Sequence, residues 1–146
     1  MEIKKLTADE VSDFKRLIEI FKDVFENDVD IPPVDHLRRL LSNPDFMVFV
    51  ALSGGNVAGG LTIYVLHRYY SVKPEAYIYD VGISPEFQRK GLGKALMAEV
   101  CRYCQANGFE NAYVEAEHDD VEAVRFYRAT AYNHEVHAVH FTYVWR

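Results

Sequence analysis

Apolar residues recur at helical spacing in the first part of the chain, after a short predicted strand at residues 2–6. A capping box of Thr7 and Glu10 predicts that a helix opens there, and an acidic, proline-containing turn at 26–33 ends it. A second, short helix is predicted over 34–41, before Asn43-Pro44. The buried face expected for the first helix comprises Val11, Phe14, Leu17, Ile18, Phe21, Val24 and Phe25.

From residue 46 the hydrophobic period shortens, which indicates strands. The strands predicted in this part are 46–52, 57–66, 75–83, 111–117 and two short ones within 134–145. Ser53-Gly54-Gly55-Asn56 predicts a hairpin turn between the first two. A helix from Leu92 should end at Gly108 and bury Leu92, Leu96, Val100, Tyr103 and Cys104. A last helix is predicted over 121–129, with Asp119 or Asp120 as its cap.

This order of elements predicts one α/β (α+β) domain over residues 1–146. Hairpins mixed with strand–helix units favour a mixed, mostly antiparallel sheet of six to seven strands, with about four helices packed on it. The chain has 146 residues, of which 49% are hydrophobic, and a chain of this size can bury a core without disulfides or metals.

The charge balance narrows the classes of partner. A formal net charge of −6 argues against nucleic acid, because phosphate contacts need a basic face. No apolar run reaches the length of a membrane span, and the N-terminus carries no leader pattern, so a cytoplasmic location is expected. Cys101 and Cys104 are expected to be core residues in a reducing compartment.

The loop between the strand 75–83 and the next helix is the most informative segment. Its two glycines, Gly91 and Gly93, allow backbone N–H groups to approach a ligand, and Arg89, Lys90 and Lys94 add positive charge. These features predict a phosphate-binding loop. The segment matches neither the Rossmann fingerprint nor the P-loop.

Gln88-Arg89-Lys90-Gly91-Leu92-Gly93 resembles the Q/R-x-x-G-x-G/A signature of the GNAT superfamily of N-acetyltransferases, whose element order is also similar. The resemblance implies acetyl-CoA as co-substrate. Its pyrophosphate would be bound by Gln88, Arg89, Lys90, Gly91, Leu92, Gly93 and Lys94, and its pantetheine arm by the backbone of Val81 and Ile83.

A second stretch supports the same resemblance. Residues 120–127 are similar to N-x-x-A-x-x-x-Y, with Asp120 in place of the usual asparagine that contacts the coenzyme and Tyr127 in place of the tyrosine that faces the sulfur. Within the superfamily, Ala76-Tyr77-Ile78-Tyr79-Asp80-Val81 and the pair Asp119-Asp120 resemble the small aminoglycoside 3-N-acetyltransferases of type I.

Acetyl transfer to an amine needs a base, an oxyanion donor and an acid. Asp80 is the predicted base or amine anchor, and strict alternation places it on the face of Ile78 and Gly82. The N–H of Val81 is the predicted donor to the thioester oxygen, and Tyr127 the acid for the leaving thiolate. No covalent cysteine intermediate is expected, so transfer would occur directly in a ternary complex.

Acidic residues on and just after the predicted strand 111–117 are suited to bind a cationic acceptor. Glu115, Glu117 and Asp119 are the predicted substrate-binding residues, although a solvated surface explains such a run equally well. Tyr64, Tyr69, Tyr70 and Tyr79 could line a substrate cleft. His134, His137 and His140 are unsuited to a metal site because the region reads as strand and turn, so no metal is expected.

Three functions stay open. The first is an N-acetyltransferase for an aminoglycoside-like amine, the second acts on another small amine, a polyamine or a protein amine, and the third is a non-catalytic acyl-CoA-binding module. The expected partner is a small-molecule amine, without nucleic acid or membrane. The oligomeric state is open, a homodimer included.

Overall fold

A computed structural model describes all 146 residues, which fall into two compact units, Met1–Glu115 and Ala116–Arg146. The first unit holds a sheet with strand order β1-β2-β3-β4-β5, antiparallel except for the parallel pair β4 and β5. Its strands are β1 (Glu2–Lys5), β2 (Phe46–Ser53), β3 (Asn56–Arg68), β4 (Ser71–Ile83) and β5 (Asn111–Val114). The predicted mixed, mostly antiparallel sheet is confirmed, but with five strands rather than six to seven.

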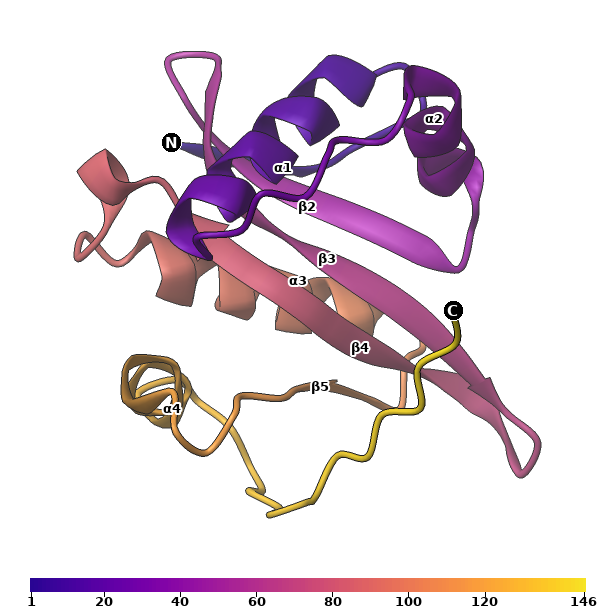
Figure 1. The fold of residues 1–146 in the computed structure, drawn as a ribbon. Coiled ribbons are helices and arrows are strands. Elements are labelled where there is room, and N and C mark those ends of the chain that lie inside the picture. The colour runs from indigo at the N-terminus through magenta and orange to yellow at the C-terminus, as the bar shows by residue number, and fades with distance from the viewer. The chain divides into compact units, whose positions relative to one another are not determined.

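Helices cover both faces of this sheet (Figure 1). They are α1 (Val11–Val24) and α2 (Val34–Ser42) on one face and α3 (Leu92–Ala106) on the other, while the short 3-10 helix η1 (Pro85–Phe87) lies in the loop between β4 and α3. A Cβ built on Gly60 or Gly82 would meet side chains of α1, so both glycines face that helix. Phe49 instead packs edge-on against Tyr103 of α3, with ring centroids 5.3 Å apart. Alternation along β2 and β3 thus divides the core into an α1 layer and an α3 layer.

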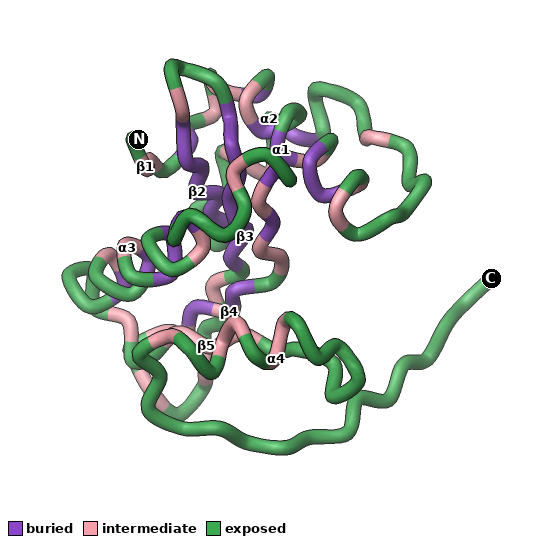
Figure 2. The backbone as a smooth tube through the Cα atoms, turned by 90° about the vertical axis from the view of Figure 1, so that its left-hand side faces the viewer, coloured by how far each residue is buried: buried purple, intermediate pink, exposed green.

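The core follows the predicted faces with small shifts. In α1 the buried residues are Val11, Phe14, Leu17, Ile20 and Phe21, whereas Phe25 is 43% exposed because the helix has already ended. Helix α1 begins at Val11 rather than at Thr7. The Glu10 carboxylate accepts from the N–H of Thr7 at 2.8 Å, which closes a turn before the helix instead of capping it. Figure 2 shows the buried residues concentrated in β2, β3 and the inner side of α1.

Two predicted glycine turns are confirmed. Gly54 and Gly55 have φ of 57° and 84°, the conformation that a tight hairpin requires. Gly108, with φ of 79°, ends α3, and the N–H of Phe109 donates back to the carbonyl of Cys104 at 3.1 Å. This is the Schellman arrangement, which satisfies a carbonyl at the helix end.

The second unit contains α4 (Val121–Arg128) and no strand. The prediction of two strands within 134–145 is wrong here, and Glu117 lies beyond the end of β5. Apolar residues of this segment are exposed, Trp145 at 84%, and Figure 2 shows the whole segment in green. Residues 134–145 form no strand because their unit contains no other strand to pair with, and a lone strand leaves its backbone N–H and C=O groups without partners.

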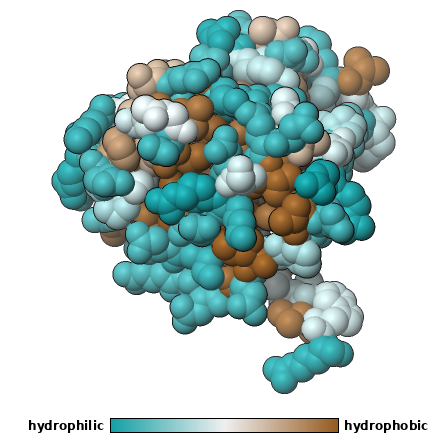
Figure 3. All heavy atoms as spheres, turned by 90° about the horizontal axis from the view of Figure 1, so that it is seen from above, coloured by the Kyte–Doolittle hydropathy of each residue, from teal (hydrophilic) through white to brown (hydrophobic).

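Hydrophilic residues dominate the surface seen from above in Figure 1, with hydrophobic side chains visible between them (Figure 3). None of the helices has the length and apolar character needed to cross a membrane.

Candidate functional site

The second half of β4 has a free edge. Strand β5 pairs with β4 only from Glu75 to Ile78, so residues 79–83 of β4 have no neighbouring strand on the side opposite β3. A strand edge of this kind presents a row of backbone donors and acceptors that an extended ligand can bind.

The antiparallel ladder determines which residues present these groups. Ser84 donates its N–H to the carbonyl of Ala58 at 2.8 Å, so the alternation turns the N–H and C=O groups of Ile83 and Val81 away from β3. The side-chain amide of Gln88 donates to the carbonyl of Ile83 at 2.8 Å, as this outward orientation requires. Val81 and Ile83 therefore have the orientation that their predicted pantetheine contacts need, and Gln88 ties the loop to the strand.

A β-bulge corrects the predicted orientation of Asp80. Leu61 pairs with Val81 and Ile63 with Ile78, so Tyr79 and Asp80 together face the single residue between them on β3. The extra residue breaks strict alternation. Ile78 and Val81 consequently share the α3 face, whereas Asp80 does not lie on the face of Ile78 as predicted but on the α1 face with Gly82.

Asp80 lies in a partly desolvated environment. Burial raises the pKa of its carboxyl above the ordinary value of 3.8, and no cation forms an ion pair with it. The nearby Tyr64 hydroxyl has a raised pKa, first because of burial and then because of the Tyr79 and Asp80 charges. A carboxylate with a raised pKa next to a free strand edge is suited to accept a proton from an amine.

The loop after β4 exposes backbone donors. Arg89 and Gly91 have φ of 61° and 82°, and no turn or cap hydrogen bond engages the N–H groups of residues 89–94. The first backbone bond of α3 runs from the N–H of Ala95 to the carbonyl of Gly91, at 3.0 Å. A Cβ at Gly91 would have no atom within 4 Å, so space is open over the helix start. Free N–H groups at the positive end of a helix dipole suit a phosphate group.

Side chains of the loop add positive charge to this candidate anion-binding surface. Arg89, Lys90 and Lys94 are exposed and form no ion pair, and the Lys90 ammonium lies 5.8 Å from the Phe87 ring centroid. Leu92 is buried in the core, so it can offer a ligand only its backbone N–H. The residues present thus fit the pyrophosphate of a coenzyme A molecule.

A row of aromatic rings extends over the α1 face of the sheet. Tyr79 contacts both Tyr64 and Tyr77 edge-on, with ring centroids 5.3 and 5.6 Å apart, and Tyr77 stacks on Tyr113 at 4.7 Å. The Tyr77 hydroxyl donates to a carboxylate oxygen of Glu115 at 2.6 Å. Tyr64 and Tyr79 are 40% and 54% exposed, so this face of the row is accessible.

The row includes Tyr77 and Tyr113, two tyrosines that the sequence analysis did not assign to a substrate cleft. The signal was available, because Tyr77 and Tyr79 alternate on one strand, but without strand pairing nothing connected them with Tyr113. By contrast, Tyr69 and Tyr70 lie at the hairpin between β3 and β4.

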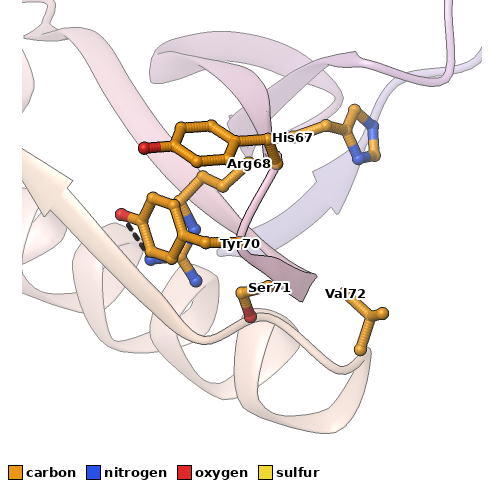
Figure 4. Close-up of a pocket in the computed structure, with 6 residues that line it drawn as sticks. His67, Arg68, Tyr70, Ser71 and Val72 are labelled. Carbon is orange, nitrogen blue, oxygen red and sulfur yellow. Dashed lines mark hydrogen bonds between the residues drawn. The ribbon is translucent and has the colours of Figure 1, made fainter.

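That hairpin holds a pocket of about 570 Å³ lined by His67, Arg68, Tyr69, Tyr70, Ser71 and Val72 (Figure 4). The Arg68 guanidinium lies 5.1 Å from the centroid of the Tyr70 ring, and His67 points away from both. This pocket is at the start of β4, whereas the free edge, Asp80 and the loop are at its end, so the pocket is separate from them.

In the second unit, Asp120 caps α4 by accepting the N–H of Ala123 at 3.1 Å. This confirms the predicted cap, although the predicted coenzyme contact of Asp120 stays a prediction. Tyr127 is half-buried on α4, and its ring packs against Phe126 at 5.0 Å. Glu117 and Asp119 are exposed, and neither forms an ion pair. A pocket of about 570 Å³ lies along α4, lined by His118, Val121, Val124, Arg125, Arg128 and Ala129.

The cysteines are free thiols, and Cys101 is exposed rather than in the core as predicted. Burial raises the pKa of Cys104 to about 11, which keeps it protonated at neutral pH. Such a thiol is a poor nucleophile. No group of three or more His, Cys, Asp or Glu residues is placed to hold a metal ion.

Comparison with known proteins gives a consistent result. The sequence profile described as "Acetyltransferase (GNAT) family" matches residues 14–132. The chain is similar to the solved structure of an aminoglycoside acetyltransferase from an uncultured soil metagenomic sample, in complex with trehalose, with 41% identity and a TM-score of 0.97. That match covers 99% of this chain and 96% of the other. A structure of the same acetyltransferase contains sisomicin.

Two curated relatives show shorter similarities. The mycothiol acetyltransferase of Pseudarthrobacter chlorophenolicus is 36% identical over 76 residues, 52% of this chain and 24% of the relative. The ribosomal protein bS18-alanine N-acetyltransferase of Escherichia coli K12 is 26% identical over 62 residues, 42% of each chain. The match thus spans less than half the length of these curated relatives.

Proposed function

Because the chain belongs to the acetyltransferase (GNAT) family, we propose that it transfers an acetyl group from acetyl-CoA to a primary amine of a small, aminoglycoside-like cation. The observation that carries the acceptor class is the similarity over nearly the full length to an aminoglycoside acetyltransferase. The tyrosine row with its uncompensated carboxylates supports it, because such a surface attracts an amino sugar.

The loop and the free edge of β4 are the proposed binding site of acetyl-CoA. The N–H groups of residues 89–94, with Arg89, Lys90 and Lys94, would hold the pyrophosphate, and Gln88 would keep the loop in place. The outward backbone groups of Val81 and Ile83 would pair with the pantetheine arm. Bound in this way, the coenzyme supplies an activated acetyl group next to the bulge.

The chain's own side chains would then transfer the protons, and a backbone N–H would stabilise the developing negative charge. Asp80 accepts the proton that makes the acceptor amine nucleophilic, directly or through water. The N–H of Val81 stabilises the negative charge that develops on the thioester oxygen, and the Tyr127 hydroxyl gives its proton to the departing thiolate. Glu115, Glu117 and Asp119 would hold further ammonium groups of the acceptor, and Asp120 would contact the coenzyme. The free thiols support a reducing, cytoplasmic location.

A second candidate is acetylation of another amine. The similarities to a bS18-alanine N-acetyltransferase and to a mycothiol acetyltransferase favour a protein amine or a different small amine as acceptor. A non-catalytic acyl-CoA-binding module would need the loop and the free edge, but neither Asp80 nor Tyr127.

Thiol release from acetyl-CoA, followed against a panel of aminoglycosides, polyamines, monoamines and N-terminal peptides, tests these proposals. We expect turnover with aminoglycosides, and a loss of roughly 10²–10⁴-fold in kcat in Asp80→Asn and a smaller loss in Tyr127→Phe. Asp9→Asn and Tyr132→Phe are matched controls, each an exposed residue that loses the same group.

The outcomes separate the candidates. Turnover only with peptides or monoamines would replace the aminoglycoside acceptor by the second candidate. Coenzyme binding without turnover of any amine would leave the binding module. Full activity of both site variants would disprove the assigned roles of Asp80 and Tyr127 and leave the reaction class intact.

A further inference from the structure

Tyr77 and Glu115 form a pair whose geometry is set by strand pairing. Tyr77 of β4 faces Tyr113 of β5 in the parallel register, and the two rings stack at 4.7 Å with an interplanar angle of 8°. Two residues after Tyr113, on the same face, Glu115 receives the hydrogen bond of the Tyr77 hydroxyl, 2.6 Å long. Tyr113 keeps the phenol from swinging aside, so the carboxylate is bound by a rigid donor.

Glu115 has no positive partner, unlike the other carboxylate next to this strand pair. Glu75 accepts a hydrogen bond from Asn111 at 3.1 Å and lies 3.7 Å from the Arg68 guanidinium. Glu115 is exposed, forms no ion pair, and uses only its Oε1 atom in the bond with Tyr77. The Oε2 atom of an oriented, uncompensated carboxylate is left for a cation.

The same tyrosine row leads from this pair toward Asp80. The Tyr79 ring contacts Tyr77 on one side and Tyr64 on the other, and Asp80 follows Tyr79 in the bulge, on the same α1 face. Both carboxylates therefore border one aromatic surface on the α1 face. An acceptor that places its reacting amine at Asp80 has a second carboxylate within the same surface for another ammonium group.

We infer that Tyr77 is a positioning residue that orients Glu115 to bind a second, non-reacting ammonium group of the acceptor. The inference rests on the proposed function for the identity of the reacting amine. The carboxylate raises the pKa of the Tyr77 hydroxyl, so the phenol stays a hydrogen-bond donor over the working pH range. The pair thereby selects acceptors that carry at least two amines.

Steady-state kinetics and calorimetric binding of sisomicin test the inference in Tyr77→Phe, Glu115→Gln and the double variant. We expect each single variant to raise the sisomicin KM and Kd about tenfold, the scale of one hydrogen bond to a charged group. Because Tyr77 acts through Glu115, the double variant should show no larger change than Glu115→Gln alone. We expect kcat and the acetyl-CoA KM to stay within about twofold.

Tyr103→Phe is the matched control, since it removes a tyrosine hydroxyl in the α3 layer, where the ring packs on Phe49 and is not part of the tyrosine row, and it should leave the KM unchanged. Equal effects of Tyr77→Phe and Tyr103→Phe, multiplying effects in the double variant, or a selective loss of kcat would each overturn the inference. If wild type acetylates sisomicin and the variants match it, the inference fails while the proposed function stands. If wild type binds sisomicin with the expected variant effects but acetylates no amine, the positioning role stands and the proposed function fails.

Discussion

At the scale of single residues, Asp80 shows how a local irregularity creates a candidate catalytic group. The bulge at Tyr79 and Asp80 turns this carboxylate toward the α1 face and into a partly desolvated environment. Desolvation favours the protonated carboxyl, which makes the carboxylate more basic and at the same time less favourable for the fold.

The first prediction concerns the pH dependence of activity. The acid limb of kcat/KM should lie above pH 3.8, in the direction of the raised Asp80 pKa, because the base must be ionised. In Asp80→Asn the residual activity should lose this limb. A limb that persists unchanged in the variant would assign the titration to another group.

The same shift has a consequence for stability. Between the ordinary pKa and the raised one, the folded chain binds more protons at Asp80 than the unfolded chain does, so stability falls as pH rises through this window. At neutral pH Asp80→Asn should therefore be more stable than wild type, and at pH 3 the difference should vanish. Urea unfolding at the two pH values measures it, and a variant that is less stable at pH 7 would contradict the argument.

At the scale of elements, close packing of β3 against β2 and of β4 against α1 depends on glycine. A Cβ on Gly60 would lie 2.4 Å from the backbone oxygen of Phe49, and one on Gly82 would lie 2.7 Å from a ring carbon of Phe21. A ring can rotate aside, whereas a carbonyl held in a strand cannot.

Alanine at either position should therefore destabilise the fold, and the two should differ. We expect Gly60→Ala to lower the free energy of unfolding by about 3 kcal/mol or more, and Gly82→Ala by about 1–2 kcal/mol. Urea titrations with unchanged m-values would measure both. An equal loss, or a larger loss at Gly82, would show that strand β2 yields more readily than the Phe21 ring.

At the scale of the whole molecule, the net charge of −6 has a local origin. Residues 110–122 contain six acids, Glu110, Glu115, Glu117, Asp119, Asp120 and Glu122, and no Lys or Arg, so the other acids and bases cancel. The loop of Arg89, Lys90 and Lys94 carries the opposite sign. Two segments of opposite charge are consistent with the two proposed substrates, an anionic coenzyme and a cationic acceptor.

Salt should therefore weaken acceptor binding. We expect the sisomicin KM to rise about three- to tenfold when ionic strength increases from about 0.05 to 0.5 M, because screening shortens the reach of the acidic segment. The double variant Glu117→Gln/Asp119→Asn should respond less to salt. Glu26→Gln/Asp30→Asn removes the same number of charges elsewhere, and a salt response reduced equally there would attribute the effect to net charge alone.

The sequence determined those features of the protein that depend on neighbouring residues. Helical spacing identified α1 and α3, and glycines identified the hairpin turn at Gly54-Gly55 and the end of α3 at Gly108. The loop Gln88–Lys94 predicted an anion-binding helix start. These are properties of short segments, because they depend on backbone conformation and local charge. It also placed Asp80 next to that loop, and the family resemblance followed from these residues.

Tertiary structure decided what depends on pairing between distant segments. The bulge that reorients Asp80 exists only in the register of β3 and β4, the free edge of β4 only because β5 stops at Val114, and the Tyr77–Glu115 bond only because β5 lies parallel to β4. Residues 134–145 show the opposite outcome. Their alternating pattern predicted strands, but none forms, because an alternating segment becomes a strand only where a partner strand accepts its hydrogen bonds.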